Sequence, residues 1–336
     1  MRKHNALEIL TGPVWAITDA GAEIVQAILA RRLIGERLNP EEIAQRIGSG
    51  RRPEACDGLQ AWDLEAESYV ELEAAKPMAP QISGRQVVAV VGIYGTIVPR
   101  ASMLSDTSGV MSSESIAKNV RAMASDPNVS AIVLDIDSPG GAVRGSRETA
   151  AEIRAARKHK PIVAVANYEA QSLAYWYASQ ASEIVASPSS LLGSIGVLGI
   201  HTDESAALEQ EGKRVTVLRY GENKGQGNPF EPLSESARAE IEKLLQETGR
   251  AFDADVARGR GVGVETVRGR FGQGSSFSAS DAVSRGMADS VGTLEDGIRR
   301  AAALARGAEP SQRQPAATGE EDVTRRLAAL SLLGMP

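Results

Sequence analysis

The sequence contains little of what several common enzyme classes require. Its single cysteine, Cys56, cannot form an intramolecular disulfide, a pattern that suits a reducing compartment such as the cytoplasm. Cys56 lies in a polar, turn-rich stretch with no histidine near it in sequence, which disfavours a cysteine nucleophile. H-E-x-x-H, C-x-x-C and a convincing phosphate-binding loop are also missing. The sequence therefore predicts neither a metal nor a cofactor.

Histidine is also scarce. The three histidines are His4, His159 and His201, of which His4 lies in the terminal segment and His159 in a charged run. No serine stands in a G-x-S-x-G motif. A Ser-His-Asp triad is thus poorly supported, and a hydrolytic serine would need another base, for which lysine is the known substitute.

Long apolar runs are absent too. The longest uncharged run, 184–200, is interrupted by Ser, Gly and Pro and is too short and polar to span a membrane. The basic N-terminal residues Arg2 and Lys3 precede a stretch broken by Glu8 and Pro13, so we expect no signal peptide. The net charge of 37 − 43 = −6 argues against general nucleic-acid binding.

Composition and sequence pattern divide the chain into three regions. With roughly 150 residues per domain, a chain of this length has room for about two domains. Helical spacing over 22–33 predicts a helical N-terminal region, closed by a Pro- and Gly-containing linker, over 1–84. Residues 301–336 are rich in Ala, Gly, Pro and Gln, which predicts a flexible tail with a short amphipathic helix over 323–333.

The middle region, 85–300, alternates short apolar runs with helical patterns. Continuous apolar strands between helices predict an α/β core whose mostly parallel sheet is covered on both faces. We expect strands over 87–91, 131–136, 161–165 and 215–218, and helices over 115–125, 148–158 and 235–258.

One segment that could carry chemistry, 137–141, follows the second of these strands. Its two adjacent glycines, Gly140 and Gly141, allow a tight turn and leave N–H groups free to face a ligand. Such N–H groups can stabilise an oxyanion. The alternative is an ordinary glycine-rich turn.

A second segment, 168–178, follows the third strand. Ser172 is expected at the N-terminal turn of a helix, where unpaired N–H groups favour developing negative charge. The N–H of Leu173 would supply another oxyanion donor. The alternative is that Ser172 only caps the helix.

Two more segments complete the set, namely 193–197 with the sequence G-S-I-G-V and the glycine-rich loop 221–225. The loop contains Lys224 and follows a predicted strand rather than lying on a charged helix face. A lysine acts as a base only when neutral, and burial in an apolar site favours that form. The alternative is a solvated loop lysine.

These segments, in this order, resemble the signal peptide peptidase A family of Ser-Lys proteases, which includes the capsid-maturation proteases of tailed phages. The family shows a D/N-S/T-P-G-G segment, a serine opening an aromatic-rich helix, G-S-I/L-G-V and a lysine in a G-x-x-K loop. The matching positions here are 137–141, Ser172 before Tyr175-Trp176, 193–197 and 221–224. The resemblance covers roughly residues 85–300.

The resemblance implies a role for each matching residue: Ser172 as nucleophile, Lys224 as general base, Gly141 and Leu173 as oxyanion-hole donors, and Ser194 as the residue that orients the lysine. It also implies a Clp-protease/crotonase-like α/β spiral core, whose protomers usually assemble into homo-oligomeric rings.

The sequence departs from the cellular members at one point. Leu173-Ala174 stand where those members usually have Gly-Gly, so we expect the Leu173 side chain to narrow the site. The segment 12–17 resembles the opening of phage head proteases, and no membrane anchor is apparent. The 12–17 segment and the expected flexible C-terminal tail together favour a phage or prophage enzyme that cleaves scaffold, portal or coat proteins in the host cytoplasm or inside immature heads.

Three alternatives remain open. The chain could be a cellular protease of the signal-peptide-peptidase type. A crotonase-like fold could instead turn over acyl-CoA thioesters with paired backbone N–H groups. A catalytically inactive core could also serve as an assembly scaffold, with the terminal regions as interaction arms.

Overall fold

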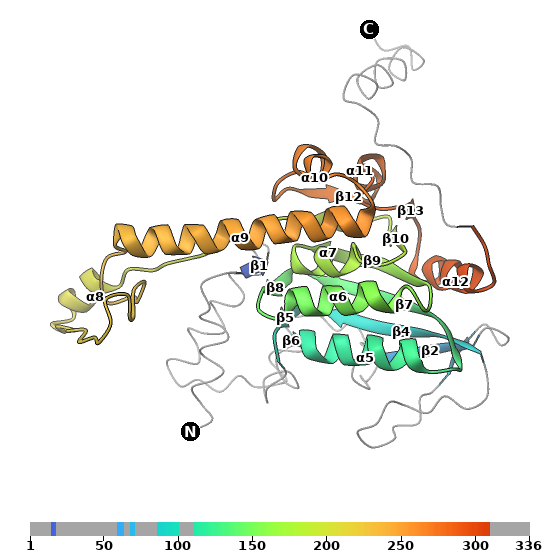
Figure 1. Cartoon of the computed structure of the whole chain (residues 1–336), viewed down its shortest axis with the longest axis horizontal. Helices are drawn as coiled ribbons and strands as arrows, with labels where there is room; N and C mark the ends of the chain where they lie inside the picture. The colour runs from blue at the N-terminus through green and yellow to red at the C-terminus, as the bar shows by residue number, and fades with distance from the viewer. Residues whose placement is uncertain (1–14, 18–58, 64–67, 71–85, 101–109, 310–336) are drawn as a thin grey trace, which may run out of the picture.

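The computed structural model describes residues 15–17, 59–63, 68–70, 86–100 and 110–309. The helices predicted over 22–33 and 323–333 lie outside these ranges. The described residues form an α/β core from which a long arm projects (Figure 1). The predicted α/β fold with a largely parallel sheet is therefore confirmed.

Three parallel strands lie at the centre of a nine-stranded sheet: β4 (Val87–Tyr94), β7 (Val129–Ser138) and β9 (Ile162–Gln171). They are rich in valine and isoleucine, which favour strands. Almost every residue of β4 and β7 is buried. This burial agrees with a sheet covered on both faces, as continuous apolar runs require.

Two strands extend the sheet on the β4 side. β2 (Leu59–Asp63) pairs antiparallel with β4, and β3 (Ser68–Val70) pairs antiparallel with β2. Both lie inside the region 1–84 that was expected to be helical. The structure differs from that expectation at these positions, because the core sheet already begins before residue 85.

On its other side, β9 pairs with two strands in succession. β10 (Glu183–Ala186) pairs with the first half of β9 and β11 (Leu191–Gly193) with its last three residues. β12 (Ser276–Ser278) lies antiparallel to β11, and β13 (Ser290–Val291) lies parallel to β10. The C-terminal end of β9 is thus held by a different neighbour from its start.

A second, four-stranded sheet has the order β1-β8-β5-β6, from β1 (Trp15–Ile17), β8 (Gly140–Ala142), β5 (Thr96–Val98) and β6 (Val110–Ser112). β8 follows β7 after a single residue, Pro139. The predicted glycine-rich segment therefore forms a strand of its own at the carboxyl end of β7.

Helices cover the two faces of the large sheet. On one face lie α5 (Ser113–Ser125), α6 (Ser146–Ala156) and α7 (Leu173–Ala178), and on the other lies α12 (Leu294–Ala305). Alternate residues of β4 divide between the two: Ala89 and Val91 face the first set, Val88 and Val90 face α12. α12 also includes positions 301–305, which were expected to belong to the flexible tail.

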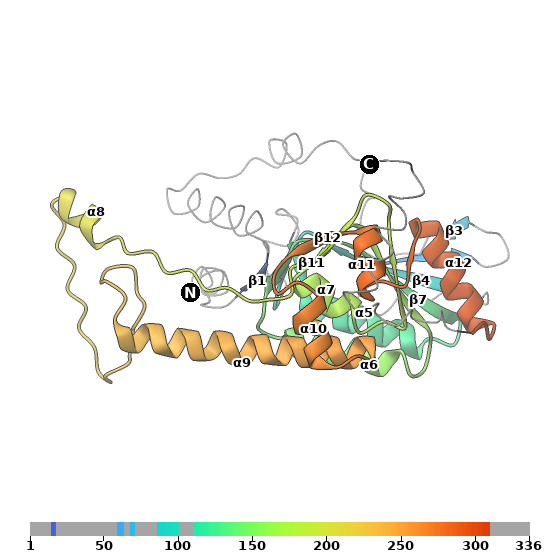
Figure 2. The ribbon, with the colours of Figure 1, turned by 90° about the horizontal axis from the view of Figure 1, so that it is seen from above.

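The arm consists of α8 (Ser205–Gln210), a long loop and the first half of α9 (Glu235–Arg260) (Figure 2). The second half of α9 packs on the core, where Phe252 stacks on Trp176 of α7 with 4.3 Å between ring centroids. Over its first half, only Ala237 is buried. Two further helices, α10 (Val264–Arg270) and α11 (Ala279–Arg285), follow α9.

One predicted strand is wrong. Residues 215–218 lie in the arm loop without strand pairing, and the Leu218 side chain is 90% exposed. The run Val-Thr-Val-Leu favours an extended backbone, but a strand also needs a neighbour to pair with. Among the residues that the structure describes, the protomer provides no such neighbour at this position.

Candidate active site

Ser172 occupies the junction between β9 and α7 in a conformation that side chains rarely adopt. Its backbone has φ 52° and ψ −118°, and the residue is 1% exposed. It precedes α7 as the N-cap, yet its side chain makes no capping hydrogen bond. The interpretation of Ser172 as a simple helix cap therefore fails. Backbone strain of this kind persists only where surrounding structure fixes it, and it is common at active sites.

The hydrogen bonds of Ser172 show what holds it. Its N–H donates to the carbonyl of Gly193 at 2.8 Å, and its Oγ donates to the carbonyl of Gly196 at 3.4 Å. The N–H of Trp176 donates to the Ser172 carbonyl at 3.0 Å and closes the first turn of α7. The structure thus brings Ser172 against the predicted 193–197 segment.

Ser194 lies in the same turn and also has a positive φ, of 51°. Its N–H donates to the Ser275 carbonyl at 2.8 Å. The preceding Gly193 has φ 124°, and a Cβ there would lie 2.5 Å from the Ser275 carbonyl oxygen. Only glycine fits at position 193, because both the backbone angle and the close contact exclude a side chain.

Gly141 lies in the middle of β8, and α7 packs against this strand. A Cβ at position 141 would lie 1.9 Å from the Ile97 carbonyl oxygen of β5, so glycine is required for the two backbones to approach. Gly141 and the first residue of α7, Leu173, are thereby brought to the same part of the molecule. The first N–H groups of a helix have no acceptor within the helix, so the Leu173 N–H is available as a donor.

The Leu173 side chain does not lie where we expected it. It is fully buried and belongs to the hydrophobic cluster under α5 and α6. Its replacement of glycine therefore fills the core instead of narrowing an open site.

Lys224 is not brought to Ser172 within one protomer. It lies exposed in the arm loop, and its Nζ has no hydrogen bond or ion pair with any residue of the described ranges. Ile241 of α9 lies beside Gly227, whereas Gly249 lies beside Val197, next to the serine turn. At 1.5 Å per residue, these two positions of α9 are about 12 Å apart. The hydroxyl and the amine therefore do not meet in a single chain.

The structure also shows polar groups near the strand ends that sequence reasoning missed. Asp135 of β7 is buried and accepts hydrogen bonds from the Tyr94 hydroxyl at 2.6 Å and the Asn167 side chain at 3.1 Å. Burial raises the pKa of Asp135 and outweighs these two bonds, which lower it. Burial, above all, also raises the pKa of Glu169, with a contribution from nearby Asp137. The sequence did contain a signal for these groups, because each is an acidic residue near the carboxyl end of one of two neighbouring parallel strands.

In the described part of the chain, no three or more His, Cys, Asp or Glu side chains gather as a metal site would require. In the same ranges, no helix combines the length and apolarity needed to traverse a bilayer. What remains is a buried, strained serine with backbone N–H donors beside it. Fold and site together define an α/β protein with a buried, strained serine at the junction of a strand and a helix.

Residues 154–307 match the profile described as Peptidase family S49. Over these residues the chain is thus similar to peptidase family S49.

Three curated relatives are similar over much of the chain. Capsid assembly protease C of Escherichia phage lambda is 30% identical over 76% of this chain. Head-tail preconnector protein GP5 of Enterobacteria phage P21 is 31% identical over 63% of it, and Protease 4 of Salmonella typhi is 32% identical over 65%. The chain spans 58%, 42% and 35% of these relatives, respectively. Among solved structures, a point mutant of ClpP1 from Listeria monocytogenes matches 62% of this chain and 94% of its own, with 17% identity and a TM-score of 0.37.

Proposed function

We propose that this protein is a serine endopeptidase in which Ser172 is the nucleophile and Lys224 the general base. The observation that carries the proposal is the conformation of Ser172, whose backbone is strained and whose buried side chain makes no capping hydrogen bond. The contacts of β9, β11 and α7 hold this serine in its strained conformation, and backbone strain that is maintained in this way is concentrated at functional sites.

The mechanism that follows uses only groups of the chain. A neutral Lys224 takes the proton of Ser172, and the alkoxide attacks a peptide carbonyl. The N–H groups of Gly141 and Leu173 hold the oxyanion, a contribution typically worth about 3–4 kcal/mol per donor. Lys224 then returns the proton to the leaving amine, and water hydrolyses the acyl-enzyme by the same route. Ser194 is the proposed partner that orients the lysine.

The position of Lys224 makes assembly part of this proposal. The arm around it exposes large apolar side chains, with Leu218 90% and Tyr220 fully exposed and Phe230 41% exposed. Apolar groups gathered on a projecting segment are typical of a protein–protein interface. We infer that the arm packs on a second copy of the chain and delivers Lys224 to the serine of that copy. A ring in which each protomer serves its neighbour satisfies this requirement.

The substrate class is inferred from the relatives. Two of them carry names that refer to capsid assembly and to the head-tail preconnector of phages. We propose that this chain likewise cleaves scaffold, portal or coat proteins during phage head maturation, within the host cytoplasm. Because Protease 4 of Salmonella typhi is also similar to this chain, a cellular protease is the second candidate function.

The test combines labelling with mutation. An active-site serine reagent, a fluorophosphonate, is expected to label the wild-type protein and not Ser172→Ala. Both Ser172→Ala and Lys224→Ala are expected to abolish cleavage of a protein substrate. Near-wild-type cleavage by either variant would refute the dyad, and a wild-type protein that neither reacts nor cleaves would support the inactive scaffold instead.

A further inference from the structure

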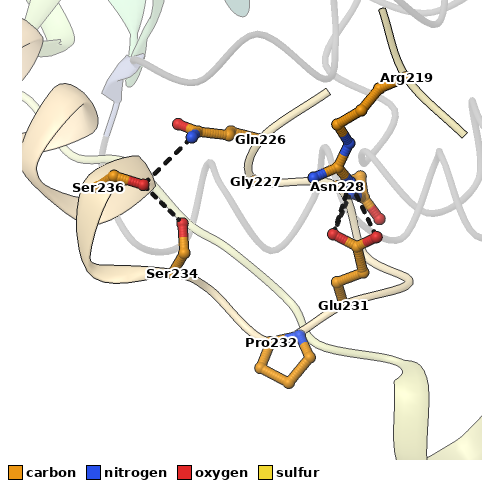
Figure 3. A pocket seen from close by; sticks show the side chains of 8 residues that line it. All are labelled: Arg219, Gln226, Gly227, Asn228, Glu231, Pro232, Ser234 and Ser236. Carbon is orange, nitrogen blue, oxygen red and sulfur yellow. Dashed lines mark hydrogen bonds and ion pairs between the residues drawn. The ribbon is translucent and has the colours of Figure 1, made fainter. Parts of the chain in front are cut away.

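Lys224 lies in the segment 219–231 of the arm loop, and the two ends of this segment are joined by an ion pair. Arg219 donates through its Nη2 group to both carboxylate oxygens of Glu231, at 2.8 and 2.7 Å. The hydrogen bond from Arg219 lowers the pKa of Glu231, so the carboxylate stays ionised. Figure 3 shows this ion pair beside Asn228, at one side of a small pocket. Lys224 lies on the segment that the pair encloses.

Asn228 connects the middle of this loop to the ion pair. Its side-chain NH2 donates to the Gly225 carbonyl at 2.8 Å, and its side-chain oxygen accepts from the Phe230 N–H at 2.9 Å. The Asn228 amide also lies 3.5 Å from Glu231, and its main-chain carbonyl lies 3.1 Å from Nε2 of His201. One half-buried side chain thus fixes the residue that follows Lys224.

The other side of Lys224 is fixed as well. The Lys224 N–H donates to the Gly221 carbonyl at 3.1 Å. Gln226 donates to the side chain of Asn223 and to Ser236 in the first turn of α9, each at 3.1 Å. The backbone around Lys224 is therefore held from both directions and tied to a long helix.

The side chain of Lys224, unlike the backbone around it, is not held by such contacts. In the part of the chain that the structure describes, Lys224 Nζ has no partner, although its main chain is fastened on both sides. A loop whose backbone is held in place while its lysine side chain has no partner is suited to presenting an amine to another surface. A misplacement of about 1 Å in such a group can cost about a hundredfold in rate.

We propose that Asn228 is a positioning residue that holds the loop so that Lys224 reaches the reacting serine. The inference rests on the proposed function and assigns Asn228 no contact with substrate. Asn228→Asp retains an oxygen for the Phe230 N–H, but it cannot donate to Gly225 and places a second carboxylate beside Glu231. We expect kcat to fall about tenfold to a hundredfold while KM changes little.

The experiment measures kcat and KM on a peptide substrate for the full-length wild type, Asn228→Asp, Asn228→Ala and Lys224→Ala, with light scattering to follow assembly. Lys213→Ala is the matched control, because it removes an exposed ion pair with Glu211 on the same arm, outside the segment that the Arg219–Glu231 pair encloses. Unchanged kcat in both Asn228 variants, with Lys224→Ala inactive, would overturn the inference and leave the dyad intact. Equal losses in kcat and assembly would also overturn it. An active Lys224→Ala would instead refute the proposed function.

An independent observation concerns the strand β1. β8 has two edges: Ile97 of β5 pairs with Gly141 on one edge, and β1 occupies the other edge in antiparallel register. In that register Ala16 lies opposite Gly141, the proposed oxyanion donor. The edge of the strand that carries this donor is therefore already filled by the chain itself.

A sheet edge of this kind is where extended peptides bind, by adding a strand through main-chain hydrogen bonds. A substrate must bring its scissile carbonyl to the Gly141 N–H, and an antiparallel strand centred opposite Gly141 competes for the same backbone groups. We infer that β1 is an autoinhibitory strand which must leave β8 before a substrate binds there. This inference, too, rests on the proposed function.

The test uses Ala16→Pro, since proline has no N–H and disfavours strand pairing, with Ala16→Ser as the control that keeps the backbone donor. We expect Ala16→Pro to raise kcat/KM for a short peptide about tenfold, the factor that ~1.4 kcal/mol of lost pairing produces. Ala16→Ser should match the wild type. Equal or lower kcat/KM in Ala16→Pro, with circular dichroism and fluorophosphonate labelling unchanged, would overturn the inference. If the fluorophosphonate does not label the wild type, that result would count against the proposed Ser-Lys dyad instead.

Discussion

The separation of Ser172 and Lys224 within one chain leads to a sharp prediction about mixed assemblies. Ser172→Ala keeps the lysine and Lys224→Ala keeps the serine, and each variant alone should be inactive. If the lysine of one protomer serves the serine of its neighbour, an active site forms wherever an intact serine meets an intact lysine. Mixed oligomers should therefore recover activity, whereas sites built within single chains should recover none.

The size of the recovery follows from the geometry. With equal amounts of both variants mixed at random, each site has a one-half chance of an intact serine and a one-half chance of an intact lysine. About one quarter of wild-type activity is expected for a ring in which each arm reaches one neighbour. The offset of about 12 Å along α9 between the loop and the serine turn is too large for one amine to serve both arrangements.

The assay is co-expression of the two variants from equal copies with different tags, followed by tandem purification and peptide cleavage. The control replaces one partner with the double variant Ser172→Ala/Lys224→Ala, which cannot complement Ser172→Ala. If mixed oligomers are isolated and remain inactive, the shared-site reasoning is wrong, because a dyad formed within a single chain also recovers no activity on mixing.

Three further predictions concern the core. Arg260 and Asp289 form a 2.8 Å ion pair with side chains 0% and 2% exposed, so Asp289→Ala should cost about 3–5 kcal/mol in urea unfolding, and a loss under about 1 kcal/mol would contradict this. Burial raises the pKa of Asp135 in the folded state. The stability of the wild type should therefore fall as pH rises from the pKa of an unfolded-state aspartate, near 4, through the raised folded-state pKa. Asp135→Asn should flatten this slope in melting curves measured from about pH 4 to 8. An unaltered slope would show that Asp135 does not titrate as inferred. Gly141→Ala places a methyl group 1.9 Å from the Ile97 carbonyl, so fluorophosphonate labelling should drop at least about tenfold, and normal labelling would show that β8 can move aside.

Local sequence patterns determined most of the core elements. The strand predicted over 131–136 occupies 129–138, and the helix predicted over 235–258 occupies 235–260. Both elements can be predicted from local sequence alone. The buried strand is a continuous apolar run, and the helix begins after a serine cap and ends at a glycine. The strand predicted over 215–218 failed because a strand depends on a partner, and none of the described residues of the protomer pairs with it.

The sequence by itself determined that a serine, a glycine pair and a G-S-I-G-V turn follow successive strands, and parallel strands bring their carboxyl ends together. It could not decide where Lys224 lies, because a glycine-rich loop places no constraint on direction. Only the tertiary structure shows the lysine on a projecting arm, since the orientation of α9 is set by distant contacts such as Phe252 on Trp176. The strain at Ser172 was likewise invisible in the sequence, because it arises from β9, β11 and α7 together fixing one residue's backbone.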